Sequence, residues 1–265
     1  MIKYDYHSHS NYSSDAHTPM DKMIERAIDL GLTEFAITDH VDFAYPSSTL
    51  TLSGINIKNY FDELMFNKRK YRHKIKVIVG VELSIRPDIA HICQALTESY
   101  AWDFVIGSTH DVKGLDWYYQ ESYEGKSKQQ AYQEYFENML ECIKTCDCFD
   151  VIGHLDYVER YPRMYEDKAL HYSDYADIID EILTLLIKKG KGIEVNTSGF
   201  YYNLGRPQPQ RAIIARYIEL GGKIITVGSD AHRPDNIAAH FGDAWNILQE
   251  LGVKKISQFD GRKVF

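Results

Sequence analysis

The feature that most constrains the fold is a regular alternation of short apolar runs with amphipathic segments, repeated along all 265 residues. Runs such as Phe35–Ile37 and Val77–Val79 are almost continuously apolar, as strands covered on both faces should be. Sustained alternation of this kind predicts a parallel sheet with helices outside it. The chain length fits a closed α/β barrel better than an open sheet. We therefore predict one α/β domain over residues 1–265, without a linker or an internal repeat.

The periodicity places seven strand-then-helix units along the chain. The predicted strands cover residues 3–9, 34–40, 76–85, 104–110, 150–156, 192–198 and 223–232. The predicted helices cover residues 20–30, 58–73, 91–100, 129–146, 173–189, 210–220 and 236–251. Two segments, 41–57 and 111–128, are expected to be long loops after strands, where active-site walls are commonly built.

Composition excludes several classes of function and partner. Thirty Lys and Arg against 38 Asp and Glu give a net charge of −8, which argues against nucleic acid or an anionic membrane as the main partner. No apolar run is long enough to span a membrane, and the first residues lack the apolar core of a secretion signal. The four cysteines match neither zinc nor redox spacing, so we expect reduced thiols in a cytoplasmic protein. The oligomeric state stays open.

Potential metal ligands stand at the C-terminal ends of almost all the predicted strands. Barrel enzymes build their active sites from these strand ends. A single histidine there is usually solvated, and Asp39 or Asp230 alone could cap a helix. Independent explanations of that kind do not account for so many ligands at equivalent positions. The strand ends carry His7, His9, Asp39, His40, Glu82, His110, His154, Asp156, Glu194, Asn196, Asp230 and His232.

Two pairs of these residues have a spacing that predicts the direction of their side chains. Side chains at positions i and i+2 of a strand point to the same face. His7 with His9, and Asp230 with His232, can therefore each direct two ligands into one cavity. Imidazole and carboxylate together suit Zn, Mn or Fe, and ligands at this density can fill more than one coordination sphere.

At this point the sequence resembles the PHP (polymerase and histidinol phosphatase) family. The resemblance implies a distorted, TIM-like (β/α)7 barrel and a site for up to three divalent metal ions, Zn, Mn or Fe. The residues after 232, Arg233-Pro234 and Phe241–Trp245, resemble the histidinol-phosphate phosphatase branch. The matching motifs, in family order, are His7-Ser8-His9, Thr38-Asp39-His40, Gly80-Val81-Glu82, Ser108-Thr109-His110, Gly153-His154-Leu155-Asp156 and Ser229-Asp230-Ala231-His232.

The resemblance also implies an assignment of ligands to metals. One metal takes His7, His9, Glu82 and Asp230. Glu82 bridges to a second metal, which His110 and His154 also hold. A third takes Asp15, His40 and His232. Some family members have histidine at the position of Asp15, so His17 is an alternative ligand; we favour Asp15 because it keeps the family spacing.

The activity that the resemblance implies is metal-dependent hydrolysis of L-histidinol phosphate to L-histidinol and phosphate, in histidine biosynthesis. The expected mechanism is in-line attack on phosphorus by a hydroxide that bridges two metals. We expect Asp230, His232 and His40 to be the catalytic residues. Asp230 would accept a proton from the nucleophile, and a histidine or a metal-bound water would protonate the leaving alkoxide.

Arginines and aromatic residues are the candidates for substrate contacts. Arg160 and Arg206 follow the fifth and sixth predicted strands, and the arginine fork matches phosphate oxygens. The runs Trp117–Tyr119 and Tyr201-Tyr202 could wall a pocket for a small imidazole-bearing phosphomonoester or simply pack the loops. Alternative functions are action on another phosphomonoester, such as a phosphotyrosine protein or a small nucleotide, or a metal-binding module without catalysis.

Overall fold

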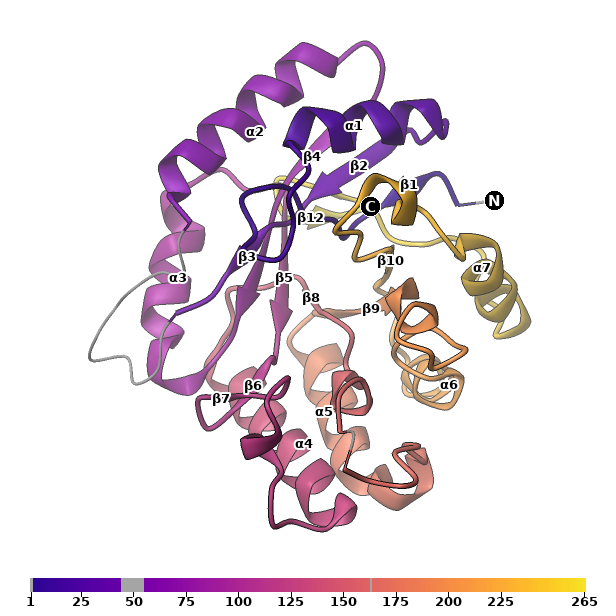
Figure 1. Ribbon diagram of the computed structural model, residues 1–265. Helices are drawn as coiled ribbons and strands as arrows, with labels where there is room; N and C mark the ends of the chain where they lie inside the picture. Colours follow the sequence, from indigo (N-terminus) through magenta and orange to yellow (C-terminus); the bar gives the residue numbers. More distant parts are fainter. Residues whose placement is uncertain (1, 44–54, 163) are drawn as a thin grey trace.

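The computed structural model of the chain describes residues 2–43, 55–162 and 164–265 and has a nearly closed parallel barrel at its centre (Figure 1). Neighbouring strands in the barrel follow one another in chain order, as repeated right-handed βαβ units require. The order is β1 (Tyr4–Asp5), β2 (Glu34–Ile37), β4 (Lys76–Ser84), β5 (Phe104–Ser108), β8 (Val151–Ile152), β9 (Gly192–Asn196) and β10 (Ile225–Gly228). A further short strand, β3 (His40–Val41), continues from β2 and pairs with β4.

The first and last strands meet through a few bonds rather than a full ladder. The Tyr6 N–H donates to the Val227 carbonyl at 3.0 Å, and Ser8 forms an isolated parallel bridge with Ala231. These contacts bring the end of β1 beside the end of β10. The predicted single-domain, seven-stranded barrel of the TIM-like type is thus confirmed.

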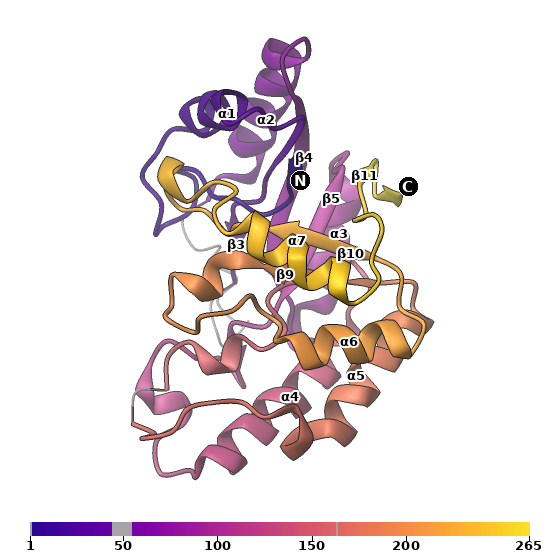
Figure 2. The ribbon, with the colours of Figure 1, turned by 90° about the vertical axis from the view of Figure 1, so that its right-hand side faces the viewer.

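Helices surround the strands on their outer side, as two views at right angles show (Figures 1 and 2). In α1 the buried residues Met20, Met23, Ile24 and Ala27 recur at the spacing of a single helix face. The sequence prediction of these helices is confirmed to within a few residues, except at the start of the last one. They are α1 (Met20–Asp29), α2 (Ile57–Tyr71), α3 (Ala90–Ser99), α4 (Lys128–Thr145), α5 (Ala176–Lys188), α6 (Arg211–Glu219) and α7 (Phe241–Glu250).

Apolar residues fill the inside of the barrel, and an ion pair helps to close its N-terminal end. An aromatic cluster of Tyr6, Phe104 and Phe259 fills the interior, with the first two rings 5.1 Å apart and edge to face. Phe259 belongs to a C-terminal hairpin of β11 (Phe259–Asp260) and β12 (Lys263–Val264). Arg262 in its turn pairs with Asp150, which precedes β8, at 2.9 Å. This closure leaves the opposite, C-terminal strand ends open for a site.

Several predicted boundaries were wrong. The strand predicted over 3–9 contains only Tyr4–Asp5, so His7 and His9 lie in irregular backbone beyond it. The helix predicted from residue 236 begins at Phe241, because Ala238 and His240 adopt positive φ angles of 55° and 59°. The segment 111–128, predicted as a loop, contains the hairpin β6 (Asp111–Val112) and β7 (Leu115–Asp116).

The loop predicted over 41–57 lies largely outside the described residues, which stop at residue 43 and resume at residue 55. Among the helices that the structure describes, none combines the length and the apolar character that crossing a membrane requires.

Candidate metal centre

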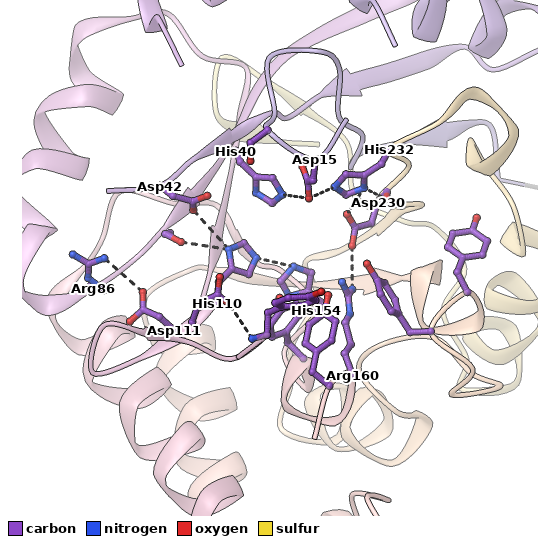
Figure 3. Close-up of a pocket in the computed structure, with 18 of the residues that line it drawn as sticks. Asp15, His40, Asp42, Arg86, His110, Asp111, His154, Arg160, Asp230 and His232 are labelled. Carbon is purple, nitrogen blue, oxygen red and sulfur yellow. Dashed lines mark hydrogen bonds and ion pairs between the residues drawn. The ribbon is translucent and has the colours of Figure 1, made fainter. Parts of the chain in front are cut away.

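The predicted ligands converge at the C-terminal strand ends around one cavity of about 1070 Å³ (Figure 3). Histidines and carboxylates from the loop after β1, from β3 and from the ends of β5, β8 and β10 form its floor and one wall. His7, His9 and Glu82 are buried, each with 0% of its surface exposed, and are not among the described lining residues. The predicted site residues that line the cavity itself are Asp15, His40, His110, His154, Arg160, Asp230 and His232.

The first group of ligands is fully enclosed. The Nε2 atom of His7 lies 3.2 Å from Glu82 Oε2 and 3.1 Å from His9 Nε2. The His9 Nε2 atom in turn lies 3.2 Å from Asp230 Oδ1. The four residues predicted to share one metal are therefore in mutual contact.

The second group meets on the other oxygen of Glu82. Glu82 Oε1 lies 3.1 Å from His154 Nε2 and 3.3 Å from His110 Nε2, and the two ring nitrogens are 3.4 Å apart. Because its two oxygens face separate groups of histidines, Glu82 has the position that a bridging carboxylate needs.

The third group lies at the rim of the cavity. Asp15 Oδ2 is 3.0 Å from His232 Nε2 and 3.8 Å from His40 Nε2, while 55% of the Asp15 side chain is exposed. His17 is exposed and is not among the described residues that line the cavity. Of the two alternatives, the structure brings Asp15 to the other predicted ligands.

The arrangement of the donor atoms suits bound divalent cations. Within the described part of the chain, the buried atoms Glu82 Oε2 and His40 Nδ1 lack a hydrogen-bond partner, although they lie only 2.9 Å apart. A buried donor and acceptor without a hydrogen bond are costly, and either a proton on His40 or a shared metal ion would remove that cost. Three-residue groups whose donor atoms lie within 4.8 Å of one another are His9/His40/His232, His7/His9/Asp230, His40/Asp42/His110 and Glu82/His110/His154.

Charge in the cluster keeps the carboxylates ionised. Burial raises the pKa of Glu82, but His7, His40 and His110 outweigh it and hold that pKa well below its usual range. Burial likewise opposes ionisation of Asp230, and the charges of His7 and Arg160 outweigh it, so its pKa is also lowered strongly. Both residues are therefore anionic acceptors at neutral pH.

Asp230 is held in an unusual backbone conformation. Its φ of 54° lies in the left-handed region, which is uncommon for residues other than glycine. Its Oδ2 atom accepts from Ser198 Oγ at 3.1 Å and from Arg160 at 3.0 Å, leaving Oδ1 toward His7 and His9. Strained backbone at a cluster of functional groups is typical of an active site.

Asp39 supports the loop that carries Asp15 and does not cap a helix. Its carboxylate accepts from the backbone N–H and hydroxyl of both Ser10 and Ser13, at distances between 2.6 and 3.1 Å. The Ser13 hydroxyl also lies 3.1 Å from His9 Nδ1. Nothing in the spacing of Asp39 connects it with two serines near the N-terminus, so the sequence did not predict this role.

The two predicted phosphate clamps differ in position. Arg160 lines the cavity, and its guanidinium is fixed by Gln208 at 2.6 Å and by Ser198 at 2.7 Å as well as by Asp230. Arg206 is not among the described residues around the cavity. Its guanidinium instead pairs with Asp156 and with Glu159.

Aromatic residues wall the mouth of the cavity, partly as the sequence suggested. Trp117 is fully buried and packs against Tyr123, whereas Tyr118 lines the cavity and is 53% exposed. Tyr157 and Tyr161, which the sequence analysis did not single out, also reach it. The tyrosines that line the cavity are Tyr118, Tyr157, Tyr161, Tyr201 and Tyr202.

Known proteins are similar to this chain over most of its length. The model of the PHP domain family matches residues 5–198. A histidinol-phosphatase of Lactococcus lactis is 32% identical over 100% of this chain and 97% of its own length. A histidinol-phosphatase of Saccharomyces cerevisiae is 22% identical over 86% of this chain and 82% of its own length.

Two solved structures share the fold. The histidinol phosphate phosphatase of Lactococcus lactis, solved with zinc, L-histidinol and phosphate, superposes with a TM-score of 0.90, covers 99% of this chain and 98% of its own, and is 31% identical. A protein of Listeria monocytogenes, at 20% identity and a TM-score of 0.75 over 91% of this chain and 99% of its own, supports the fold alone. On the family match and these full-length similarities, the chain belongs to the PHP domain family.

Proposed function

We propose that this protein is a metal-dependent histidinol-phosphatase, which hydrolyses L-histidinol phosphate to L-histidinol and inorganic phosphate. The observation that carries the proposal is the convergence of histidines and carboxylates from almost every strand end on one cavity. The full-length similarity to a relative solved with zinc, L-histidinol and phosphate supports the same substrate. We place the reaction in histidine biosynthesis, as the family resemblance implies.

The residues that would hold the metals form three adjoining groups, with Glu82 shared between the first two. We propose that up to three divalent ions bind there, with Zn, Mn and Fe all suited to imidazole and carboxylate ligands. Bound ions screen the charge of the phosphate dianion and lower the pKa of water toward neutrality. The proposed ligands are His7, His9, Glu82 and Asp230, then His110 and His154, and finally Asp15, His40 and His232.

The chain's own residues then orient the ester and move the protons. Arg160 points its guanidinium into the cavity and offers phosphate oxygens a charged, pre-positioned donor. Asp230 is ionised and presents Oδ1 beside His7 and His9, where it can take the proton of the attacking water. His40 and His232 flank Asp15 at the cavity rim and are placed to support loss of the alkoxide.

The rest of the cavity suits a small substrate with a flat, polar ring. Tyr157 and Tyr202 lie over the Arg160 guanidinium, with their ring centroids 4.9 and 4.5 Å from its central carbon. The other tyrosines that line the cavity, Tyr118, Tyr161 and Tyr201, offer aromatic surface on which an imidazole can stack. We therefore propose a small-molecule phosphomonoester as the partner, and neither nucleic acid nor a membrane. The four cysteines are free and buried, which supports a reducing, cytoplasmic location.

The decisive test compares kcat/KM for L-histidinol phosphate, p-nitrophenyl phosphate and a phosphotyrosine peptide on protein of measured zinc content. We expect a preference of several orders of magnitude for L-histidinol phosphate. Equal, slow rates on all three would keep the reaction class but reject the substrate. A preference for the phosphotyrosine peptide would move the function to the alternative of a phosphoprotein phosphatase.

A further inference from the structure

One buried carboxylate behind the ligand cluster is used by none of the proposed metal sites or chemical steps. Glu194 stands in β9 with 1% of its surface exposed. Its Oε1 atom lies 2.7 Å from His7 Nδ1. Its Oε2 atom accepts from the backbone N–H of His154 at 2.9 Å and from the Asn196 side chain at 3.0 Å.

These contacts decide which nitrogen of His7 is available to a metal. The Glu194 oxygen is the acceptor of this bond, so His7 donates to it through Nδ1–H. The other nitrogen, Nε2, faces Glu82 Oε2 and Asp230 Oδ1, at 3.2 and 3.6 Å, and is therefore the nitrogen left to bind a metal. A carboxylate behind a ligating histidine commonly fixes the tautomer and the ring orientation in this way.

An independent observation is that a glycine stands where a side chain would collide with Glu194 and His7. A Cβ atom added at Gly228, the last residue of β10, would lie 2.4 Å from Glu194 Oε1 and 2.4 Å from the Cβ of His7. Both distances are far below van der Waals contact. The absence of a side chain at this strand end therefore lets Glu194 of β9 approach His7 in the segment after β1.

We propose that Glu194 is a positioning residue for the metal centre. It holds His7 in the Nδ1-protonated tautomer and anchors the backbone of His154, so that one carboxylate sets a ligand of the first metal group and a ligand of the second. Glu194 does not bind a metal itself, since both of its oxygens already accept hydrogen bonds from His7, His154 and Asn196. The inference rests on the proposed metal site and not on the identity of the substrate.

The test is zinc binding by Glu194→Gln, measured by competition with a chromogenic chelator and by bound zinc per chain. The amide keeps the shape but removes the charge that selects the tautomer. We expect zinc affinity at the affected sites to fall about 10- to 100-fold, as for other residues behind metal ligands. Glu34→Gln is the matched control, because Glu34 is a buried carboxylate in β2 that bonds to Tyr6 and Gln258 instead. Its zinc affinity should stay at the wild-type value.

A second measurement keeps the inference testable even if the Gln variant does not fold. Long-range ¹H–¹⁵N spectra of zinc-loaded wild-type protein should show His7 protonated at Nδ1 and bare at Nε2. A proton on Nε2, or wild-type zinc affinity in a folded Glu194→Gln, would overturn the inference. Neither readout uses the substrate, so failure of the proposed phosphatase activity would be a separate result.

Discussion

At the scale of single residues, we propose that Arg160 binds the substrate and that Arg206 supports the fold. Arg160→Ala removes a fixed guanidinium that faces the cavity, and we expect kcat/KM for L-histidinol phosphate to fall about 100-fold or more. Arg206→Ala is the comparison, because Arg206 pairs with the fully buried Asp156 outside the cavity. It should change kcat/KM only severalfold but cost about 3 kcal/mol of unfolding free energy, since it leaves a buried charge unpaired. Equal losses of kcat/KM would restore Arg206 as a substrate ligand.

A second residue-scale prediction distinguishes Asp15 from His17. Asp15→Ala removes a carboxylate 3.0 Å from His232 Nε2, and we expect the protein to lose one equivalent of tightly bound zinc. His17→Ala changes an exposed side chain and should leave the zinc content unchanged. Elemental analysis of both proteins after the same dialysis measures the difference. Loss of zinc from His17→Ala alone would transfer the ligand role to His17.

At the scale of elements, the loop after β1 depends on Asp39 for its shape. Asp39→Asn replaces an acceptor of four hydrogen bonds from Ser10 and Ser13 by a group that cannot accept them all. We expect the unfolding free energy to fall by about 1–3 kcal/mol. Because this loop carries Asp15, zinc bound at the rim should also weaken. Urea unfolding and zinc titration measure the two effects, and an unchanged rim site would show that the loop holds its shape without Asp39.

The helices were predicted more accurately than the strands, for a physical reason. A helix such as α1 has a buried face that repeats over ten residues, whereas β8 has only two residues and offers no period to read. The chain beyond β1 continues as irregular backbone, so the strand predicted over residues 3–9 is longer than the strand that exists. The helix α7 begins later than predicted because Ala238 and His240 have positive φ angles. Neither alanine nor histidine is a residue type from which a positive φ angle would be predicted.

At the scale of the whole molecule, the metals should contribute to the stability of the barrel. The ligands come from strand ends along the entire chain, so bound ions connect the first strand to the last. Without them, Glu82 and Asp230 remain as buried charges. A group bound only by the folded state stabilises it by mass action. We expect removal of metal with a strong chelator to lower Tm by several degrees, and zinc to restore it. An unchanged Tm in calorimetry would contradict this.

The candidate site was more predictable than its surroundings, because its ligands share one position at the ends of parallel strands. Contacts between distant segments could not be predicted in that way. Two examples are the hydrogen bonds between Glu194 and His7 and between Arg160 and Gln208. Each joins residues that are far apart in the sequence and that no local spacing connects. The pairing of Arg206 with Asp156 is a further contact of this kind, since the place of Arg206 after a strand gives no sign of it.

One cluster of strand-end residues is proposed to hold the metals on which the phosphatase activity of this protein depends. The most direct measurement titrates zinc into metal-free protein and follows, in the same samples, bound zinc and kcat/KM for L-histidinol phosphate. We predict negligible activity without metal and a rise that saturates as up to three ions bind per chain. Full activity in protein proven free of metal would contradict the account.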